Sequence, residues 1–221
     1  MIEKIIWKIS LLAARWLARV RERGTAGGGT ARQRIYCANH TSHLDALVLL
    51  AALPAAARAQ VRPVAAAEYW RGSWWRRYLA ERVFRTVFIE RDGRELNPLS
   101  PAFEALRSGE SLIFFPEGTR GTGGGTLQLL KPGLYYLARA FQQVEIVPVW
   151  VDGADRILPK RAWLPWPERC WLTFGPPLRW DGREDAGAFL ARVRAALEAA
   201  RHQTRQPELV PHGGGSAILQ P

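Results

Sequence analysis

The sequence predicts an α/β fold, in which a central, mostly parallel or mixed sheet is flanked by helices and preceded by an amphipathic N-terminal helix. Two observations carry this prediction. Short apolar runs of strand-like composition alternate along the chain with longer helical stretches, which is typical of an α/β sandwich. The first 23 residues instead repeat their apolar positions at helical spacing and carry excess positive charge.

The expected elements follow one another from residue 35 onward. The predicted strands are Ile35–Ala38, Val61–Ala66, Val87–Ile89, Leu112–Phe115, Ile146–Val151 and Trp171–Phe174. The predicted helices are Asp45–Leu53, Ser73–Glu81, Pro101–Ser108, Gly133–Phe141 and Asp185–His202. Their alternation places most helices between strands, as a parallel sheet requires.

The chain divides into four segments. We expect residues 1–23 to form the amphipathic helix and residues 24–31, which include the run GTAGGGT, to form a flexible linker. Residues 32–206 are predicted to form the main domain, and residues 207–221 a loose tail rich in Gly and Pro. A chain of 221 residues, 48% of them apolar, suffices for one globular domain with short appendages.

The N-terminal helix has two possible partners. Its apolar positions Ile5, Leu12, Trp16 and Val20 recur at helical spacing, and basic residues exceed acidic ones by four over residues 1–23. This combination favours an anionic membrane surface, where each basic residue contributes roughly 1 kcal/mol. The alternative is that the helix simply packs on its own domain.

Composition narrows the classes of protein and partner. A formal net charge of +11 favours nucleic acid, anionic lipid or phosphorylated substrates as partners. Two cysteines, Cys37 and Cys170, are too few for a disulfide framework, so we expect a reducing compartment. The apolar run from Ala46 to Ala57 is interrupted by Pro54 and is too short to span a membrane, and we expect no secretory signal.

The first candidate site is the run Asn39-His40-Thr41-Ser42-His43-Leu44-Asp45, which follows the first predicted strand of the main domain. If Asp45 accepts a hydrogen bond from one imidazole nitrogen of His40, the other nitrogen is left as a general base. Alternatively, Ser42 and Asp45 have the spacing of a capping box, so that Asp45 only starts a helix. A metal site is not expected, because no second cluster supplies further ligands to Cys37, His40, His43 and Asp45.

A second candidate site follows the Leu112–Phe115 strand. Glu117, Gly118, Thr119 and Arg120 lie at its predicted carboxyl end, where open α/β sheets bind ligands. Arg91 follows the Val87–Ile89 strand in the same way, and Lys131 follows a glycine-rich loop. The arginines can bind phosphate through their forked donors, although each alone is equally well explained by a surface salt bridge.

These residues, in this order, resemble the glycerolipid acyltransferase family, specifically the lysophosphatidic acid acyltransferases. The resemblance consists of N-H-x-x-x-x-D at 39–45, F-I-x-R at 88–91, F-P-E-G-T-R at 115–120 and V-P-V at 147–149, and it covers roughly residues 35 to 180. It implies a fold like that of glycerol-3-phosphate acyltransferase, with residues 32–206 as the acyltransferase domain. Two other motifs are absent from the chain. The absence of G-x-S-x-G argues against a hydrolase with a nucleophile elbow, and the absence of G-x-x-x-x-G-K-[ST] argues against a P-loop.

The resemblance also implies a reaction. A fatty acyl group would pass from acyl-CoA or acyl carrier protein, as co-substrate, to the free hydroxyl of lysophosphatidic acid, giving phosphatidic acid without an acyl-enzyme. His40 would act as the base and Asp45 would hold it. Arg91, Arg120 and Lys131 would bind the acceptor, whose pocket Glu117, Gly118 and Thr119 would shape. No cofactor or metal is implied.

Partners and location follow from the same resemblance. We expect a lysophospholipid acceptor, an acyl-CoA or acyl carrier protein donor, and peripheral attachment to an anionic membrane surface on its cytoplasmic face. The aromatic and basic segment Tyr69–Tyr78 is expected at that interface, or else contains ordinary core Trp and solvated Arg. The alternatives are acylation of another lysolipid, such as a lyso-ornithine lipid or lysophospholipid, or a non-catalytic basic protein that binds membrane or nucleic acid. We expect no nucleic-acid partner.

Overall fold

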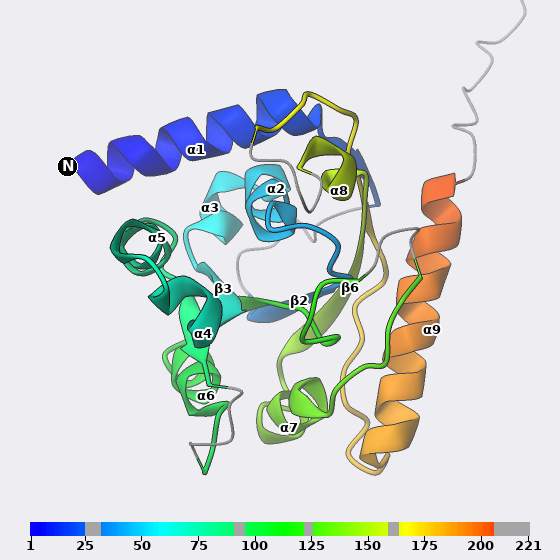
Figure 1. Ribbon diagram of the computed structural model, residues 1–221. Helices are drawn as coiled ribbons and strands as arrows, with labels where there is room; N and C mark the ends of the chain where they lie inside the picture. The colour runs from blue at the N-terminus through cyan, green and yellow to red at the C-terminus, as the bar shows by residue number, and fades with distance from the viewer. Residues whose placement is uncertain (25–31, 91–95, 122–125, 159–163, 206–221) are drawn as a thin grey trace, which may run out of the picture.

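A computed structural model describes residues 1–24, 32–90, 96–121, 126–158 and 164–205 (Figure 1). Within them lies a seven-stranded sheet in which all neighbouring strands run parallel except β6 and β7. In order across the sheet, the strands are β1 (Arg21–Arg23), β7 (Trp171–Phe174), β6 (Glu145–Asp152), β2 (Arg34–Ala38), β5 (Ser111–Phe114), β3 (Val61–Ala66) and β4 (Val87–Ile89). The predicted α/β fold with a mostly parallel, mixed sheet is confirmed.

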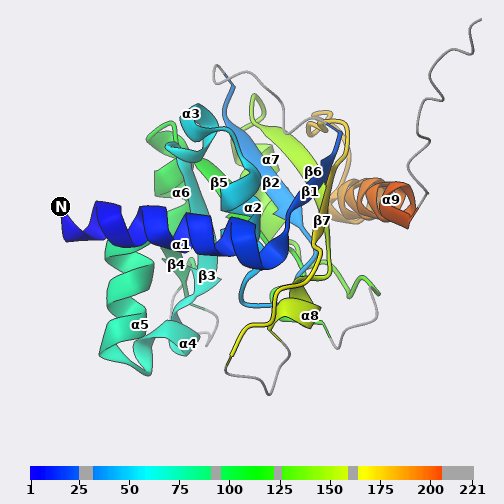
Figure 2. The same cartoon turned by 90° about the horizontal axis from the view of Figure 1, so that it is seen from above.

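Helices cover both faces of the sheet (Figures 1 and 2). They are α1 (Ile2–Ala18), α2 (Asp45–Ala52), α3 (Ala55–Arg58), α4 (Ala67–Arg71), α5 (Trp74–Tyr78), α6 (Ser100–Arg107), α7 (Gly133–Ala140), α8 (Ala154–Ile157) and α9 (Ala186–Arg205). A π-helical turn, Leu79–Val83, continues α5. In Figure 1, α1 lies across the top of the molecule above α2 and α8, whereas α6 and α7 lie on the opposite side of the sheet and α9 runs along its flank.

The alternation of strand side chains produces two hydrophobic cores. In β2, Ile35 and Cys37 pack into the core formed with α6, α7 and α9, whereas Tyr36 and Ala38 pack into the core formed with α1, α2 and α8. All five β2 residues are buried, because this strand lies in the middle of the sheet with helices on both sides. The central strands β2 and β5 are therefore held by packing on both faces, and the loops at their carboxyl ends start from these buried strands.

The predicted strands and long helices are present, with shifts of one to three residues at some ends. The predicted helical stretch Ser73–Glu81 is present, but only Trp74–Tyr78 is α-helical and Leu79 begins a π-helical turn. The short helices α3, α4 and α8 were not predicted, since four or five residues are too few to show a 3.6-residue period.

The N-terminal helix is shorter than predicted. It ends at Ala18 rather than residue 23, because Arg19 adopts a left-handed conformation and Arg21–Arg23 pairs with β7 as strand β1. Most of the predicted linker, residues 25–31, and the predicted tail, residues 207–221, lie outside the described residues.

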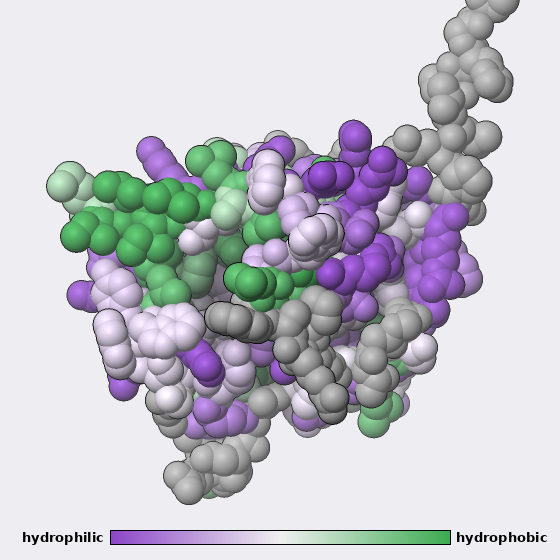
Figure 3. Space-filling model, turned by 45° about the horizontal axis from the view of Figure 1, so that its top comes forward, coloured by the Kyte–Doolittle hydropathy of each residue, from purple (hydrophilic) through white to green (hydrophobic). Residues whose placement is uncertain are grey.

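Helix α1 has two apolar faces rather than one. Leu11, Ala14 and Ala18 are buried against α2 and the sheet, and Trp7 and Val20 pack beside them. The opposite face is solvent-exposed and consists of Ile2, Ile5, Ile9, Leu12 and Trp16. Figure 3 shows apolar side chains gathered on the surface at this end of the molecule. No helix among the described residues is both long enough and apolar enough to cross a bilayer.

Candidate active site

The two candidate motifs meet at one edge of the sheet. Strands β2 and β5 are parallel neighbours, with Cys37 opposite Phe114. The run that follows β2, residues 39–45, and the run that follows β5, residues 115–121, therefore emerge side by side at the carboxyl ends of the strands. This is the position at which open α/β sheets bind ligands.

His40 and Asp45 form a hydrogen-bonded pair. His40 Nδ1 lies 2.9 Å from Asp45 Oδ2, and the Asp45 side chain is completely buried whereas that of His40 is 20% exposed. The same carboxylate accepts the backbone N–H groups of Thr41 at 2.6 Å and Ser42 at 2.8 Å. Because an ionised carboxylate only accepts hydrogen bonds, Nδ1 is the donor in this contact, and in the neutral imidazole Nε2 then keeps its lone pair.

Only one half of the predicted capping box is present, because the Asp45 carboxylate accepts the Ser42 N–H at 2.8 Å. Helix α2 begins at Asp45, but the Ser42 hydroxyl accepts a hydrogen bond from the N–H of Leu44 at 3.3 Å, not from the helix. The Asp45 carboxylate is directed back at the loop and at His40. The turn between strand and helix thus folds around the carboxylate, which allows residues five positions apart to meet.

The Glu117 carboxylate links the two loops. Its Oε1 accepts the backbone N–H of His40 at 2.7 Å, and its Oε2 accepts the N–H of Gln128 at 2.9 Å. Only 3% of Glu117 is exposed. Burial raises the pKa of Glu117, while the two backbone hydrogen bonds act in the opposite direction by favouring the charged form. Glu117 therefore shapes the site by fixing the backbone of His40 and of Gln128.

Two further contacts hold the base from other sides. The His40 ring stacks on Phe115 with ring centroids 4.2 Å apart, and the His40 carbonyl accepts the N–H of Gly121 at 2.8 Å. Together with the Glu117 and Asp45 contacts, these fix both the backbone and the ring of His40.

The predicted acceptor-binding residues surround the same loop. Gly118 has φ +70°, and a Cβ there would lie 3.0 Å from Lys131 Cδ, so the lysine stem crosses directly over this glycine. Thr119 is exposed and its hydroxyl donates to the side chain of Gln128 at 3.3 Å, while Arg120 is half-buried. The structure thus brings these three residues and Lys131 to the His40 loop. Arg91 lies outside the described residues.

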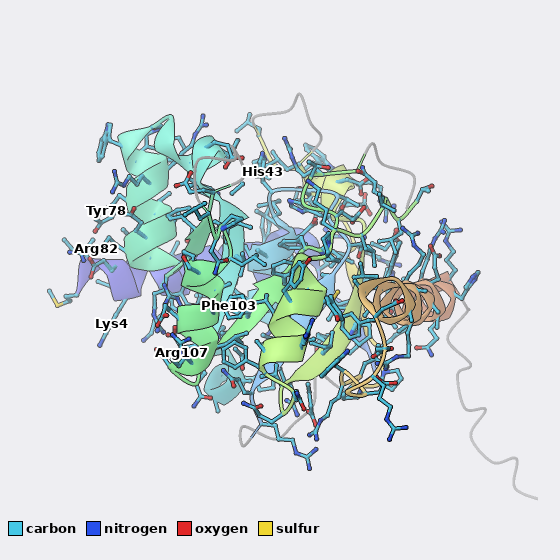
Figure 4. The ribbon with its side chains drawn as sticks, turned by 90° about the horizontal axis from the view of Figure 1, so that it is seen from below. Lys4, His43, Tyr78, Arg82, Phe103 and Arg107 are labelled. Carbon is cyan, nitrogen blue, oxygen red and sulfur yellow. The ribbon has the colours of Figure 1, made fainter. Side chains whose placement is uncertain are left out.

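His43 joins this loop to the aromatic segment Tyr69–Tyr78. Its ring stacks on that of Tyr69, with the two centroids 4.4 Å apart. The guanidinium of Arg76 lies 5.4 Å from the centroid of the Tyr69 ring. Burial, followed by the nearby charge of Arg120, lowers the pKa of His43 to about 4. In Figure 4, His43 is labelled together with Tyr78, which ends α5, and Arg82, which lies in the π-helical turn that follows it. His43 is thus a neutral side chain at physiological pH.

Three residues that support the site had no role assigned from the sequence. The Asn39 amide donates to the Val151 carbonyl at 2.9 Å and accepts the Val151 N–H at 2.7 Å, which ties the loop after β2 to the end of β6. Gln128 binds Glu117, and Arg194 of α9 donates to the carbonyls of Leu127, at 3.3 Å, and Gln128. The position of Asn39 directly before the histidine could have indicated its role, but nothing in the sequence separates Arg194 from the other arginines.

Over the part of the chain that the structure describes, no three His, Cys, Asp or Glu side chains are grouped so as to hold a metal ion. Cys37 is fully buried in β2, and burial raises the pKa of its thiol. The arrangement offers instead an oriented imidazole beside basic side chains.

Fold and site together consist of a mostly parallel α/β sheet with a carboxylate-held histidine at the carboxyl ends of its central strands. Residues 19–152, more than half of the chain, match the model of the family described as Acyltransferase, and the chain belongs to this family. The structure is similar to the crystal structure of the 1-acyl-sn-glycerophosphate (LPA) acyltransferase PlsC from Thermotoga maritima. The TM-score is 0.72 and the identity 25%, over 93% of this chain and 80% of that chain. No curated protein matches the chain. The resemblance stated from the sequence motifs is confirmed, and the chain is an LPA acyltransferase-like enzyme.

Proposed function

We propose that the enzyme transfers a fatty acyl group from acyl-CoA or acyl carrier protein to the free hydroxyl of lysophosphatidic acid, giving phosphatidic acid. The observation that carries this proposal is the 2.9 Å contact between His40 Nδ1 and the buried Asp45 carboxylate, which leaves Nε2 as a base. Family membership and the similarity to PlsC support acyl transfer in lipid synthesis.

The chemistry proceeds in one displacement at the thioester carbonyl. His40 Nε2 takes the proton from the acceptor hydroxyl as its oxygen attacks the carbonyl carbon, and the new C–O bond forms. The C–S bond then breaks, and the imidazolium returns its proton to the leaving thiolate. The Asp45 carboxylate stabilises the imidazolium between these two steps and holds the ring in place.

Basic side chains beside the loop suit a phosphorylated acceptor. Arg120 and Lys131 come to the His40 loop from the segment after β5, and we assign them, with Arg91, to the phosphate of the acceptor. A hydrogen bond to a charged group contributes roughly 1.5–3 kcal/mol, so the loss of one such contact separates a phosphorylated acceptor from a neutral one by at least tenfold.

We further propose that the enzyme is peripherally attached to the cytoplasmic face of the membrane. The exposed face of α1 carries Ile9, Leu12 and Trp16 at 60%, 67% and 69% exposure, and Trp74 of α5 is 82% exposed. Both substrates have apolar tails, so such a surface would hold the site near the lipid layer. Helix α1 packs on the domain through its other face, so the two interpretations of this helix are compatible.

An acyl-transfer screen tests the substrate assignment. Purified enzyme is offered acyl-CoA and acyl carrier protein donors, each with lysophosphatidic acid, lyso-ornithine lipid and neutral-headgroup lysophospholipids, and products are identified by mass spectrometry. We expect phosphatidic acid as the dominant product. Transfer to a lyso-ornithine lipid or lysophospholipid in preference to lysophosphatidic acid would replace the acceptor but keep the chemistry. Binding of vesicles or DNA without transfer from any donor would overturn the enzymatic proposal.

A further inference from the structure

The junction between α1 and β1 has an unusual backbone. Arg19 ends α1 with φ 38° and ψ 50°, a left-handed conformation that glycine adopts without strain and arginine does not. The turn is required because the Ala18 carbonyl accepts the N–H of Cys170 at 2.7 Å, and the Arg21 N–H in turn donates to the Cys170 carbonyl at 2.9 Å. An arginine at a position that suits glycine indicates a use for its side chain.

Next to this turn lies a cavity. It has a volume of about 330 Å³, opens to solvent, and is lined by Arg15, Arg19, Val20 and Arg21. Three of the four lining residues are therefore guanidinium-bearing, and none is acidic. Guanidinium groups bind phosphate oxygens through paired, nearly parallel N–H donors.

The arginines that line this cavity lack acidic partners among the residues that the structure describes. Among the described residues, neither Arg19 nor Arg21 forms an ion pair. Glu168, whose N–H binds the Leu17 carbonyl, directs its carboxylate to the N–H of Arg169 at 2.9 Å. Glu22 neighbours Arg21 in β1, where successive side chains point to opposite faces.

A further arginine adds to this charge. Arg15 donates to the Ala51 carbonyl at 3.0 Å, and Arg58 approaches the same carbonyl at 3.5 Å. Burial, and then the charge of Arg15, lower the pKa of Arg58. Arg15 thus has a structural role at the carboxyl end of α2, and Arg19 and Arg21 remain available for a ligand.

The cavity adjoins the exposed apolar face of α1. Leu12 and Trp16 each lie three residues before a lining arginine, one helical turn along the same side of the helix. They are 67% and 69% exposed. Apolar side chains directly beside a cationic cavity match the composition of a phospholipid, whose charged headgroup is attached to apolar chains.

We propose that the cavity lined by Arg15, Arg19 and Arg21 binds the phosphate of an anionic lipid headgroup, while Leu12 and Trp16 enter the apolar layer below it. This lipid is not the substrate. The cavity adjoins the carboxyl end of α2 at Ala51, whereas the catalytic Asp45 starts the same helix, about 9 Å away along its axis. The inference rests on the membrane attachment in the proposed function, but not on the identity of the acceptor.

The substitution Arg19→Gly separates ligand binding from structure. Glycine relieves the strain of the left-handed backbone, so the melting temperature should stay equal or rise. Loss of the guanidinium should weaken binding to vesicles of phosphatidylglycerol and phosphatidylcholine by about fivefold. A structural role for Arg19 predicts the opposite change in melting temperature. Arg21→Gln, at an exposed strand position, is the second variant and should weaken vesicle binding similarly.

Arg139→Gln provides the matched control, since it removes one exposed arginine from α7 on the other layer of the molecule. It should change vesicle binding by less than twofold. Equal binding by wild type, Arg19→Gly and Arg21→Gln, or an equal loss in Arg139→Gln, would overturn the proposal. Inorganic phosphate is the second probe. If the substitutions weaken binding of phosphate but not of anionic vesicles, the site serves a free phosphate and the lipid assignment is wrong.

Acyl transfer in detergent micelles distinguishes this inference from the proposed function. Arg19→Gly should keep wild-type turnover there, because the substrates no longer have to be reached at a membrane surface. Charge-dependent vesicle binding in a protein without transferase activity would leave the lipid site standing and contradict the proposed reaction. If the wild-type enzyme transfers acyl groups but neither Arg19→Gly nor Arg21→Gln changes vesicle binding, the proposed reaction stands and the lipid site is contradicted.

Discussion

The Oε1 atom of Glu117 accepts the backbone N–H of His40 at 2.7 Å. A residue that follows β5 therefore fixes the main chain of the base that follows β2. The second oxygen of the same carboxylate accepts the N–H of Gln128, 2.9 Å away, so three separate segments converge on one buried side chain. Both oxygens of this buried carboxylate are held by backbone N–H donors, so we expect it to affect catalysis through His40 rather than by contacting the substrate alcohol.

Replacing this carboxylate by an amide tests the link. Glu117→Gln places an NH₂ group against one of two backbone N–H donors, and a buried donor without an acceptor costs about 1–3 kcal/mol. We expect a lower melting temperature and a kcat reduced at least tenfold, with a smaller change in KM. Thermal unfolding and steady-state acyl transfer measure both. A variant with wild-type stability and kcat would show that the Glu117 contacts do not hold the base.

Arg194 of α9 is expected to act through the same link. Arg194 donates to the carbonyls of Leu127 and Gln128, the latter being the residue whose N–H binds Glu117. Arg194→Met removes both donors, so the segment can shift and kcat should fall several-fold, with partial rescue by Arg194→Lys.

Arg192→Met is the control for this helix. Like Arg194, Arg192 donates to a backbone carbonyl, that of Arg179, and it also pairs with the Glu184 carboxylate, but neither partner contacts the loop of His40. Its loss should lower the melting temperature with little change in kcat. If Arg192→Met and Arg194→Met reduce kcat equally, the Arg194 effect is one of general stability.

His43 predicts a dependence of stability on acid. Its pKa is lowered in the folded protein from 6.5 to about 4, first by burial and then by the charge of Arg120. The folded state thus favours the neutral ring. This contribution to stability is present above pH 6.5 and is lost as the pH falls through about 4, by an amount on the order of 3 kcal/mol.

The substitution His43→Phe isolates this contribution, because it keeps an aromatic ring against Tyr69 and cannot titrate. The free energy of unfolding, measured by urea titration from pH 7 to pH 4, should decrease less steeply in His43→Phe than in wild type. Identical slopes in the two proteins would mean that His43 is protonated as easily in the folded state as in the unfolded chain.

Arg120 is expected to select the charge of the acceptor. Arg120→Ala should raise KM for lysophosphatidic acid at least tenfold and leave a neutral-headgroup lysolipid within about twofold, since only the first loses a charged hydrogen bond. Competition kinetics with both acceptors in mixed micelles give the ratio directly. An equal loss for the two acceptors would remove Arg120 from the phosphate site.

Local patterns were sufficient for the framework and for the position of the site. The buried runs at β2, β5 and β6 are continuous and apolar, so their strands could be located from composition, and the residues after β2 and β5 then had to share one edge of the sheet. Contacts that depend on tertiary packing could not be found in this way. The end of α1 at Arg19 is set by hydrogen bonds to residues 168–170, about 150 positions away, and the contact of Arg194 with Gln128 spans 66 residues.

The pairing of His40 with Asp45 was likewise undecided from local sequence. Asp45 lies three residues after Ser42, as a capping interaction requires, and five residues after His40, so the local sequence does not decide which partner its carboxylate takes. In the structure it accepts the N–H groups of Thr41 and Ser42 and contacts His40 Nδ1 at once. One side chain therefore both shapes the turn and orients the imidazole.

The most direct measurement is the single-turnover rate of acyl transfer by His40→Ala with a thioester donor and lysophosphatidic acid. Removal of a positioned base should lower this rate by about 10²–10⁴-fold, with donor binding and the melting temperature close to those of wild type. Transfer at the wild-type rate by a folded His40→Ala enzyme would contradict the assignment of His40 as the group that takes the proton.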